Sequence, residues 1–287
     1  MDEHPTKESC KHLFMVDVHT HLTDNAFGEI VSDVIDRALA KNVRAALVVT
    51  ENIRDFEPVI ELYKRFPAFV LPCLGLHPIQ STGTCDESGI EVKRSVSLQD
   101  YVGVEAAIER FADVIGAIGE IGLDFSPRFC KTVDDKEVQK LILTKQVQLA
   151  QKHNLPVNVH SRSAGKQTIQ LLKELDARHV LLHAFDGRAS TALEGVANGF
   201  YFSVTASICR DPQVQKMVKA LPLERLMLET DSPAIAPVKG AVNEPSNVCI
   251  SCEHIARIKN VDVEQVRHIT TENAIKVFPK LKLMIDT

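Results

Sequence analysis

The chain has 287 residues, of which 45% are hydrophobic and 25% are charged, and its formal net charge is -5. This composition is typical of a globular protein with a large core and contains no low-complexity tract. The negative charge excludes an overall basic field that would attract a polyanion, so any nucleic-acid contact depends on local Lys and Arg or on bound cations.

The N-terminal segment, residues 1–12, is polar and charged and lacks the apolar region of a secretory signal. We expect this segment to be a mobile tail. No apolar run approaches the roughly 18 to 20 residues that cross a bilayer. The sequence therefore predicts an intracellular protein, cytoplasmic or nuclear or both, that does not interact with membranes.

Short apolar runs alternate along the chain with longer segments in which apolar residues recur every three or four positions. The apolar runs predict eight strands, at 13–18, 45–49, 69–74, 114–118, 157–159, 180–182, 200–202 and 225–228. The periodic segments predict helices at 27–41, 53–65, 98–112, 136–153, 164–175, 189–198, 213–221, 247–259 and 263–277.

Several of the predicted strands are continuously apolar, as strands buried on both faces are. Eight strand-helix units in a chain near the usual ~250 residues favour a closed (β/α)8 TIM barrel of the α/β class over an open doubly wound sheet. We expect one domain over residues 1–287. The polar segment at 80–96 has no clear period and is predicted to be a surface insertion after the third strand.

The first strand ends in an Asp-x-His-x-His motif formed by Asp17, His19 and His21. Side chains two positions apart on a strand point to the same side, so these three groups share one face. Two imidazoles with a carboxylate make half of a metal site, in which the carboxylate either binds the ion or orients a ring. The alternative is a chance grouping on a solvated loop.

Further histidines and acids follow the other predicted strands, and in a barrel these strand ends meet at one face. They are His77, Glu120, Asp124, His160, His183, Glu229 and Asp231. A single one of them is readily explained as a buried histidine with a partner, a helix cap or a turn residue. Taken together they favour a metal site at the carboxyl ends of the strands, because buried imidazoles and charges are costly unless they are paired or bind a metal.

The seven cysteines are an odd number in a chain without a secretory signal, which predicts free thiols. Cys249 and Cys252 form a C-x-x-C pattern that lacks a second cysteine pair. We interpret it as part of a helix with two small apolar side chains, with a zinc or redox role as the alternative.

Five motifs, at residues 17–21, 75–78, 119–124, 159–162 and 229–233, carry a resemblance to a known family. They read D-V-H-T-H, G-L-H-P, G-E-I-G-L-D, V-H-S-R and E-T-D-S-P. In this order the chain resembles TatD-type deoxyribonucleases, which belong to the amidohydrolase-like metal-dependent hydrolases. The resemblance implies a (β/α)8 barrel that cleaves phosphodiester bonds in DNA.

The resemblance also implies a ligand set for divalent metal ions, two or more per chain. One ion is held by His19, His21, Glu120 and Asp231, and a second by Glu120, His160 and His183, so that Glu120 bridges them. His77 is implied near the substrate phosphate or an additional metal. Mixed imidazole and carboxylate ligands favour zinc, with manganese or magnesium as alternatives.

Such a site suits phosphodiester hydrolysis, because one cation activates a water while both stabilise charge on the attacking and leaving oxygens. Asp231 is our candidate general base, and Glu120 is catalytic as the bridge. Arg162 and Lys239 are candidate phosphate contacts, although solvated surface cations are an equal alternative. DNA is the expected partner, and we expect a monomer without an obligate protein partner.

Two rival functions remain open from the sequence alone. The first is an amide or lactone hydrolase on the same barrel. In many such enzymes a carbamylated Lys bridges the metals at the position where this chain has Glu120. The second is an inactive barrel retained as a binding module.

Overall fold

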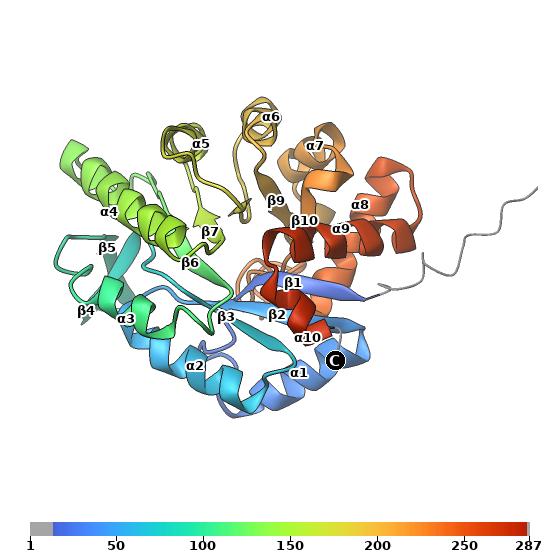
Figure 1. Ribbon diagram of the computed structural model, residues 1–287, viewed down its shortest axis with the longest axis horizontal. Coiled ribbons are helices and arrows are strands. Elements are labelled where there is room, and N and C mark those ends of the chain that lie inside the picture. The colour runs from blue at the N-terminus through green and yellow to red at the C-terminus, as the bar shows by residue number, and fades with distance from the viewer. Residues whose placement is uncertain (1–13, 286–287) are drawn as a thin grey trace, which may run out of the picture.

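The computed structural model describes residues 14–285, so the predicted mobile tail at 1–12 lies outside the described residues. A ring of parallel strands occupies the centre of this part of the chain, and helices surround it (Figure 1). The predicted (β/α)8 architecture is confirmed.

The barrel strands of the described chain follow the order β1-β2-β3-β6-β7-β8-β9-β10, and each pair of neighbours is parallel. They are β1 Met15–Thr20, β2 Val43–Val49, β3 Val70–Leu74, β6 Ala117–Gly122, β7 Val157–His160, β8 Val180–Leu182, β9 Tyr201–Val204 and β10 Leu226–Leu228. All eight predicted strands are present. The strand predicted at 114–118 lies further along the chain, so Glu120 is inside β6 and not after it.

The ring closes at its carboxyl end through a short bridge between β1 and the segment after β10. Thr20 pairs in parallel with Ser232. The Asp231 N–H donates to the His19 carbonyl at 2.9 Å, and the His21 N–H donates to the Ser232 carbonyl at 2.8 Å. The barrel is therefore nearly closed, and the closing hydrogen bonds involve the backbone of three predicted metal ligands.

The helices lie outside the ring (Figure 1). They are α1 Val31–Ala40, α2 Phe56–Arg65, α3 Val104–Phe111, α4 Val133–Lys152, α5 Gly165–Glu174, α6 Ala189–Ala197, α7 Pro212–Ala220, α8 Val248–Lys259, α9 Val263–Val277 and α10 Lys280–Ile285. Short 3-10 helices are η1 Gly28–Ile30, η2 Ile53–Asp55, η3 Ala206–Cys209, η4 Leu223–Arg225 and η5 Pro245–Asn247. Helix α4 begins earlier than predicted because Thr132 and Asp135 form a capping box.

A hairpin of two strands and one further α-helix were not predicted. The polar insertion forms an antiparallel hairpin, β4 Ile79–Cys85 and β5 Glu91–Ser95, which is a sheet of its own beside the barrel. Its tip is exposed on both faces, so it lacks the alternation that identifies a half-buried strand. Helix α10 follows Pro279 at the end of the chain, and Leu281 buries its side chain against the barrel.

Strand side chains alternate between two apolar clusters, one inside the ring and one between the ring and the helices. Val18, Leu47 and Leu71 belong to the inner cluster, which Phe278 and Leu281 complete at the end of the chain. Val48 and Val70 belong to the outer cluster with the helices. Because both faces are buried, the rigid strands hold the side chains at their carboxyl ends in fixed positions.

Candidate metal centre at the carboxyl ends of the strands

The predicted metal-binding side chains meet around one cavity of about 300 Å³ at the carboxyl ends of the strands. They come from six strands or the residues that follow them. His21, His77, Glu120, His160, His183 and Asp231 line the cavity, and the fully buried His19 lies beside them. The predicted convergence is therefore present in the folded chain.

Glu120 lies at the centre of the cluster, and its two oxygens face different histidines. Oε1 lies 2.8 Å from His160 Nδ1, 2.8 Å from His183 Nε2 and 3.4 Å from His77 Nε2. Oε2 lies 3.5 Å from His19 Nε2 and 3.6 Å from His21 Nε2. The carboxylate thus divides the imidazoles into two groups.

Asp231 completes the group around Oε2 of Glu120. Its Oδ1 lies 3.3 Å from His21 Nε2 and 3.6 Å from His19 Nε2. The ring of His183 stacks on that of His19 with centroids 3.6 Å apart, so the two groups of ligands adjoin.

The residues fit a divalent cation. Potential ligand atoms in three overlapping groups lie within 4.8 Å of one another: His19 with His183 and Asp231, His19 with His21 and Glu120, and His77 with Glu120 and His160. Among the described residues the buried His19 Nε2 has no hydrogen-bond partner, although it faces two carboxylates. A coordinated cation satisfies such a lone pair, and imidazole and carboxylate together suit zinc and similar ions.

Burial and the neighbouring charged groups shift the pKa values in the cluster in opposite directions. Burial acts to raise the pKa of Glu120, but the surrounding imidazoles hold this pKa well below its usual value. Burial acts to lower the pKa of His21, but its hydrogen bond to Asp231 and the charge of Glu120 raise it to about 9. The pKa of His183 is also raised, against burial, by Glu120.

The buried amide of Asn158 orients His19, a contact that sequence reasoning missed. Asn158 lies on β7, its Oδ1 is 2.9 Å from His19 Nδ1, and its Nδ2 donates to the Val18 carbonyl at 2.8 Å. Since the Asn158 oxygen can only accept, His19 carries its proton on Nδ1 and presents a bare Nε2 to the carboxylates.

Two acids contact the ring nitrogens of His183 and His160 that do not face Glu120. Glu229 accepts a hydrogen bond from the Ala184 N–H at 2.6 Å and lies 3.4 Å from His183 Nδ1. Asp124 lies 3.3 Å from His160 Nε2, and although burial acts to raise its pKa, the hydrogen bond with His160 lowers it to about 2. Such partners fix ring orientation and raise ligand basicity.

Asp17 has neither of the roles predicted for the carboxylate of the Asp-x-His-x-His motif, which were to bind the ion or to orient a ring. Its carboxylate accepts hydrogen bonds from the Thr230 N–H at 3.0 Å and from the Thr230 hydroxyl at 2.5 Å. It also accepts the His19 backbone N–H at 3.2 Å. Asp17 thus neither joins the cluster nor contacts a ring, and instead fastens β1 to the segment after β10.

Gly122 lets β6 approach β7 closely enough to place its ligand. Its φ is +150°, and a Cβ there would lie 2.0 Å from the His160 carbonyl oxygen. The positive φ and the lack of space both require glycine. The carbonyl instead accepts the Leu123 N–H at 3.1 Å, which fixes the loop after Glu120 against His160.

The predicted phosphate contacts differ in position. Arg162 lines the cavity, and in residues 14–285 its guanidinium has no ion pair or hydrogen bond. Lys239 is exposed on the loop after β10 and does not line the cavity, so the structure does not bring it together with the cluster. Sequence reasoning missed Lys93 and Phe129, which do line it, and Lys93 lies 3.7 Å from Glu51.

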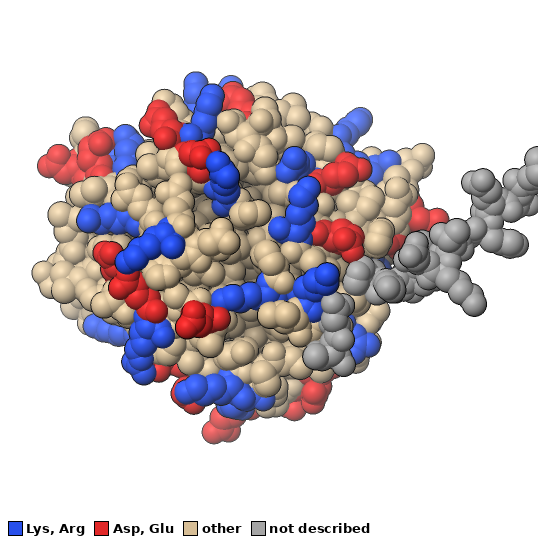
Figure 2. Space-filling model, in the orientation of Figure 1, with Lys and Arg blue, Asp and Glu red and all other residues tan. Residues whose placement is uncertain are grey.

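Charge on one face of the molecule is mixed. The face in Figure 2 carries Lys and Arg interspersed with Asp and Glu, without a continuous basic stripe. Helices in the described chain are too short or too polar to cross a membrane.

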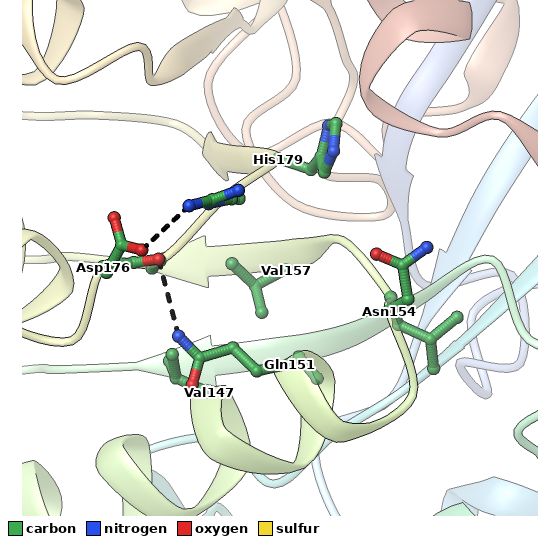
Figure 3. A pocket seen from close by; sticks show the side chains of 10 residues that line it. Val147, Gln151, Asn154, Val157, Asp176 and His179 are labelled. Carbon is green, nitrogen blue, oxygen red and sulfur yellow. Dashed lines mark hydrogen bonds and ion pairs between the residues drawn. The ribbon is translucent and has the colours of Figure 1, made fainter.

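A second cavity, of about 340 Å³, lies at the opposite end of the strands (Figure 3). Val157 at the start of β7 and His179 before β8 line it, whereas the ligands follow the other ends of these strands. Some of its polar groups contact one another, since Arg178 donates to the Asp176 carboxylate at 3.1 Å and Gln151 donates to the Asp176 carbonyl at 3.5 Å. This cavity does not contribute to the metal cluster.

The C-x-x-C cysteines lie on helix α8, as predicted. The described cysteines are free, Cys252 is buried, and its thiol donates to the Val263 carbonyl at 3.7 Å. Burial raises the pKa of Cys252 to about 12, which suits a packed thiol and not a thiolate ligand.

Known proteins share both the sequence and the fold of this chain. A family model described as "TatD related DNase" matches residues 16–279. The chain is 50% identical over 272 residues to "Deoxyribonuclease TATDN3" of Homo sapiens, which covers 95% of this chain and 97% of the relative. It is 31% identical over 276 residues to the "metal-dependent hydrolase YabD" of Bacillus subtilis, over 92% of this chain and 98% of that one.

Among solved structures, YJJV, a TatD homologue of Escherichia coli K12, superposes with a TM-score of 0.79 at 24% identity. The match covers 92% of this chain and 98% of that chain, and at this identity the likeness concerns the fold. The family match at residues 16–279 extends over nearly the whole described barrel and spans the positions of the predicted ligands. The chain belongs to the TatD-related DNase family.

Proposed function

We propose that this protein is a metal-dependent deoxyribonuclease that hydrolyses phosphodiester bonds in DNA. The observation that carries the proposal is the buried cluster of His19, His21, His160 and His183 around Glu120, open to a cavity lined by an unpaired Arg162. The name of the human relative supports the reaction and the substrate.

We assign Glu120 as a bridge between two cations. The division of its oxygens supports this, because Oε2 faces the group of His19 and His21 and Oε1 faces the group of His160 and His183. Asp231 joins the first group. His77, 3.4 Å from Oε1, is placed to contact the substrate phosphate or an additional ion. Zinc is our first candidate, and manganese or magnesium are the alternatives.

When bound here, divalent cations supply positive charge for the phosphate and make a water more acidic. Asp231 lines the cavity, and its hydrogen bond with His21 lowers its pKa although burial acts to raise it. We assign Asp231 as the general base that accepts a proton from the attacking water. Arg162 binds the phosphate of the substrate, because its guanidinium is free and lines the same cavity.

The remaining proposals concern the whole chain. Residues 1–287 form one domain that acts as a monomer without an obligate protein partner. The free cysteines of the described chain suit a reducing compartment, so we propose a cytoplasmic or nuclear location.

The test compares Glu120→Gln with the unaltered protein, both loaded with zinc or manganese, on a short 3'-tailed DNA. We expect Glu120→Gln to retain its circular dichroism spectrum and to lose cleavage, because the amide cannot bridge two cations. Glu253→Gln, at a half-exposed carboxylate on α8 in contact with Arg257, is the matched control and should cleave normally. Cleavage by Glu120→Gln at the normal rate would refute the assignment, and turnover of lactones or cyclic amides instead of DNA would refute the reaction.

A further inference from the structure

A third cavity, of about 470 Å³, adjoins the metal centre on the side of β8 and β9. Arg162 lines both this cavity and the one that holds the cluster. Ala184 and Phe185 line it too and directly follow His183 in the sequence. The two cavities therefore share Arg162 as part of their lining.

The cavity contains a buried hydroxyl that lacks a partner. Ser203, on β9, lines the cavity and is 1% exposed, and its Oγ makes no hydrogen bond to any described residue. A buried hydroxyl without a partner is unfavourable by about the free energy of a lost hydrogen bond. This Oγ can both donate to and accept from an occupant.

Two further hydroxyls lie beside it in the loop after β9. Thr205 and Ser207 are buried, line the cavity and contact each other at 2.7 Å. Only one of the two protons is used in that contact, so one donor and several lone pairs remain for an occupant. The cavity thus offers a short row of neutral hydrogen-bonding groups.

Apolar side chains also line the cavity. Phe185 and Met217 line the cavity, and the Phe185 ring packs edge-on against Phe202 with centroids 5.2 Å apart. Arg210 also lines the cavity, but its guanidinium donates to the Ala236 carbonyl at 2.9 Å and to the Pro237 carbonyl. It fixes the loop after β10 in place and is not available to an anion.

The rim of the cavity disfavours a second phosphate. Asp186 and Asp211 both line it, and Asp211 accepts the Gln213 N–H at 2.8 Å as the cap of α7. Carboxylates repel a phosphate group, whereas a neutral ring with polar edges is accepted. An occupant with one apolar face, several hydrogen-bonding edges and one phosphate near Arg162 matches these walls.

We propose that this cavity, the Ser203 pocket, binds the deoxyribonucleoside on one side of the scissile phosphate. The inference rests on the proposed deoxyribonuclease function, which it extends by a substrate subsite. The base packs against Phe185 and Met217, its edge bonds with Ser203, and Arg162 contacts the phosphate between the pocket and the metal centre. Volumes of 300 to 1,000 Å³ are usual for small-molecule sites, and a nucleoside fits within about 470 Å³.

The test measures binding to the metal-loaded full chain by isothermal titration calorimetry, which does not depend on cleavage. The probes are deoxyadenosine 5'-monophosphate, deoxyadenosine 3'-monophosphate and 2-deoxyribose 5-phosphate. We expect one of the two nucleotides to bind roughly 5- to 150-fold more tightly than the sugar phosphate, the range of base contacts with aromatic side chains.

Three variants test whether the preference for a nucleotide over the sugar phosphate arises in the Ser203 pocket. Val214→Trp fills the pocket from α7 and should abolish the preference while the sugar phosphate still binds. Lys216→Trp, exposed on the same helix and outside the pocket lining, is the matched control and should keep the preference. Ser203→Ala removes the free hydroxyl with little change in packing and should weaken only nucleotide binding, by roughly 3- to 10-fold.

The two proposals fail in different ways. Equal binding of nucleotides and sugar phosphate would overturn the pocket, as would a preference retained in both Val214→Trp and Ser203→Ala. If DNA is cleaved without a nucleotide preference, the deoxyribonuclease stands and the pocket is wrong. If the nucleotide preference is present and DNA is not cleaved, the pocket stands as a nucleotide site and the proposed reaction is wrong. Should Val214→Trp not fold, Ser203→Ala decides the question.

Discussion

Replacing Asn158 by Leu should weaken metal binding although Asn158 is not a ligand. The side chain is fully buried and makes two hydrogen bonds, one with His19 Nδ1 at 2.9 Å and one to the Val18 carbonyl at 2.8 Å. Leucine has nearly the same shape and makes neither bond. His19 then loses the contact that fixes both its orientation and the proton on Nδ1.

The expected losses of metal affinity and of stability follow from the two hydrogen bonds that Asn158 makes. Loss of an outer partner of a histidine ligand typically lowers metal affinity 10- to 100-fold, which is about 1.4 to 2.8 kcal/mol. The unpaired Val18 carbonyl and His19 Nδ1 also lower the free energy of unfolding, by about 1 to 3 kcal/mol. Zinc affinity is measured by competition with a chromophoric chelator, and stability by urea unfolding of the metal-free protein.

The matched control is Asn273→Leu. Asn273 is also buried, and its amide donates to the Leu223 carbonyl at 3.0 Å and the Leu226 carbonyl at 2.7 Å, away from the cluster. This variant should lose a similar amount of stability and keep its zinc affinity. The reasoning is refuted if Asn158→Leu binds zinc as tightly as the unaltered protein, or if both variants lose affinity equally.

Other predictions test the stability of the fold and the site. Chelation of the metal should lower the free energy of unfolding by about 2.7 kcal/mol when the free metal had been at 100 times its Kd, seen as a lower melting temperature; an unchanged value would contradict binding to the folded state. Lys280→Met should destabilise the chain by about 1 to 3 kcal/mol in urea without altering cleavage by the folded enzyme, because Lys280 Nζ donates to the carbonyls of Ala112, Asp113 and Ile115. Burial acts to raise the pKa of Asp100, but its bonds with Arg94 and Ser97 lower it. The stability that these bonds give is therefore present above about pH 3.9 and is lost as the pH falls through the lowered pKa. Asp100→Asn should accordingly be less stable than the unaltered protein at pH 6 and approach it near pH 2, and a difference independent of pH would contradict this.

The convergence of the candidate metal ligands was predictable because these residues share a simple property in the sequence. Each is a histidine or acid at or just after the end of an apolar run, and the parallel order of a barrel brings such ends to one face. His160 and Asp231 are far apart in the chain, yet no knowledge of side-chain contacts was needed to group them. This grouping required only the number of strands and their direction, whereas the choice of ligands within the group came from the family resemblance. Asp124 and Glu229 follow apolar runs in the same way but contact ring nitrogens of His160 and His183.

The residues that hold the histidine rings, such as Asn158, could not be predicted in this way. Their contacts depend on which residues face each other across the ring, and the sequence of a single strand does not show this. Asn158 contacts His19 across 139 positions, and β7 is not a neighbour of β1 in the sheet. One signal was present, because Asn158 is a polar residue two positions before His160 in an otherwise apolar strand and so shares its face. Lys239 was predicted to contact the phosphate, but it is exposed on the loop after β10 and does not line the cavity. The charge of a residue in a loop does not indicate in which direction the loop runs.

The seam between β1 and β10 links closure of the ring to the geometry of the site. His19 and Asp231 are joined through their backbones, His21 is joined to Ser232, and Asp17 holds Thr230 on the same seam. Because the side chains of His19, His21 and Asp231 project from this seam, a shift of β10 would break the closing hydrogen bonds and also separate Asp231 from His21. One half of the site is therefore positioned by the bonds that close the barrel. The other half, with His160 and His183, lies on strands inside the sheet and needs Asp124 and Glu229 to hold its rings.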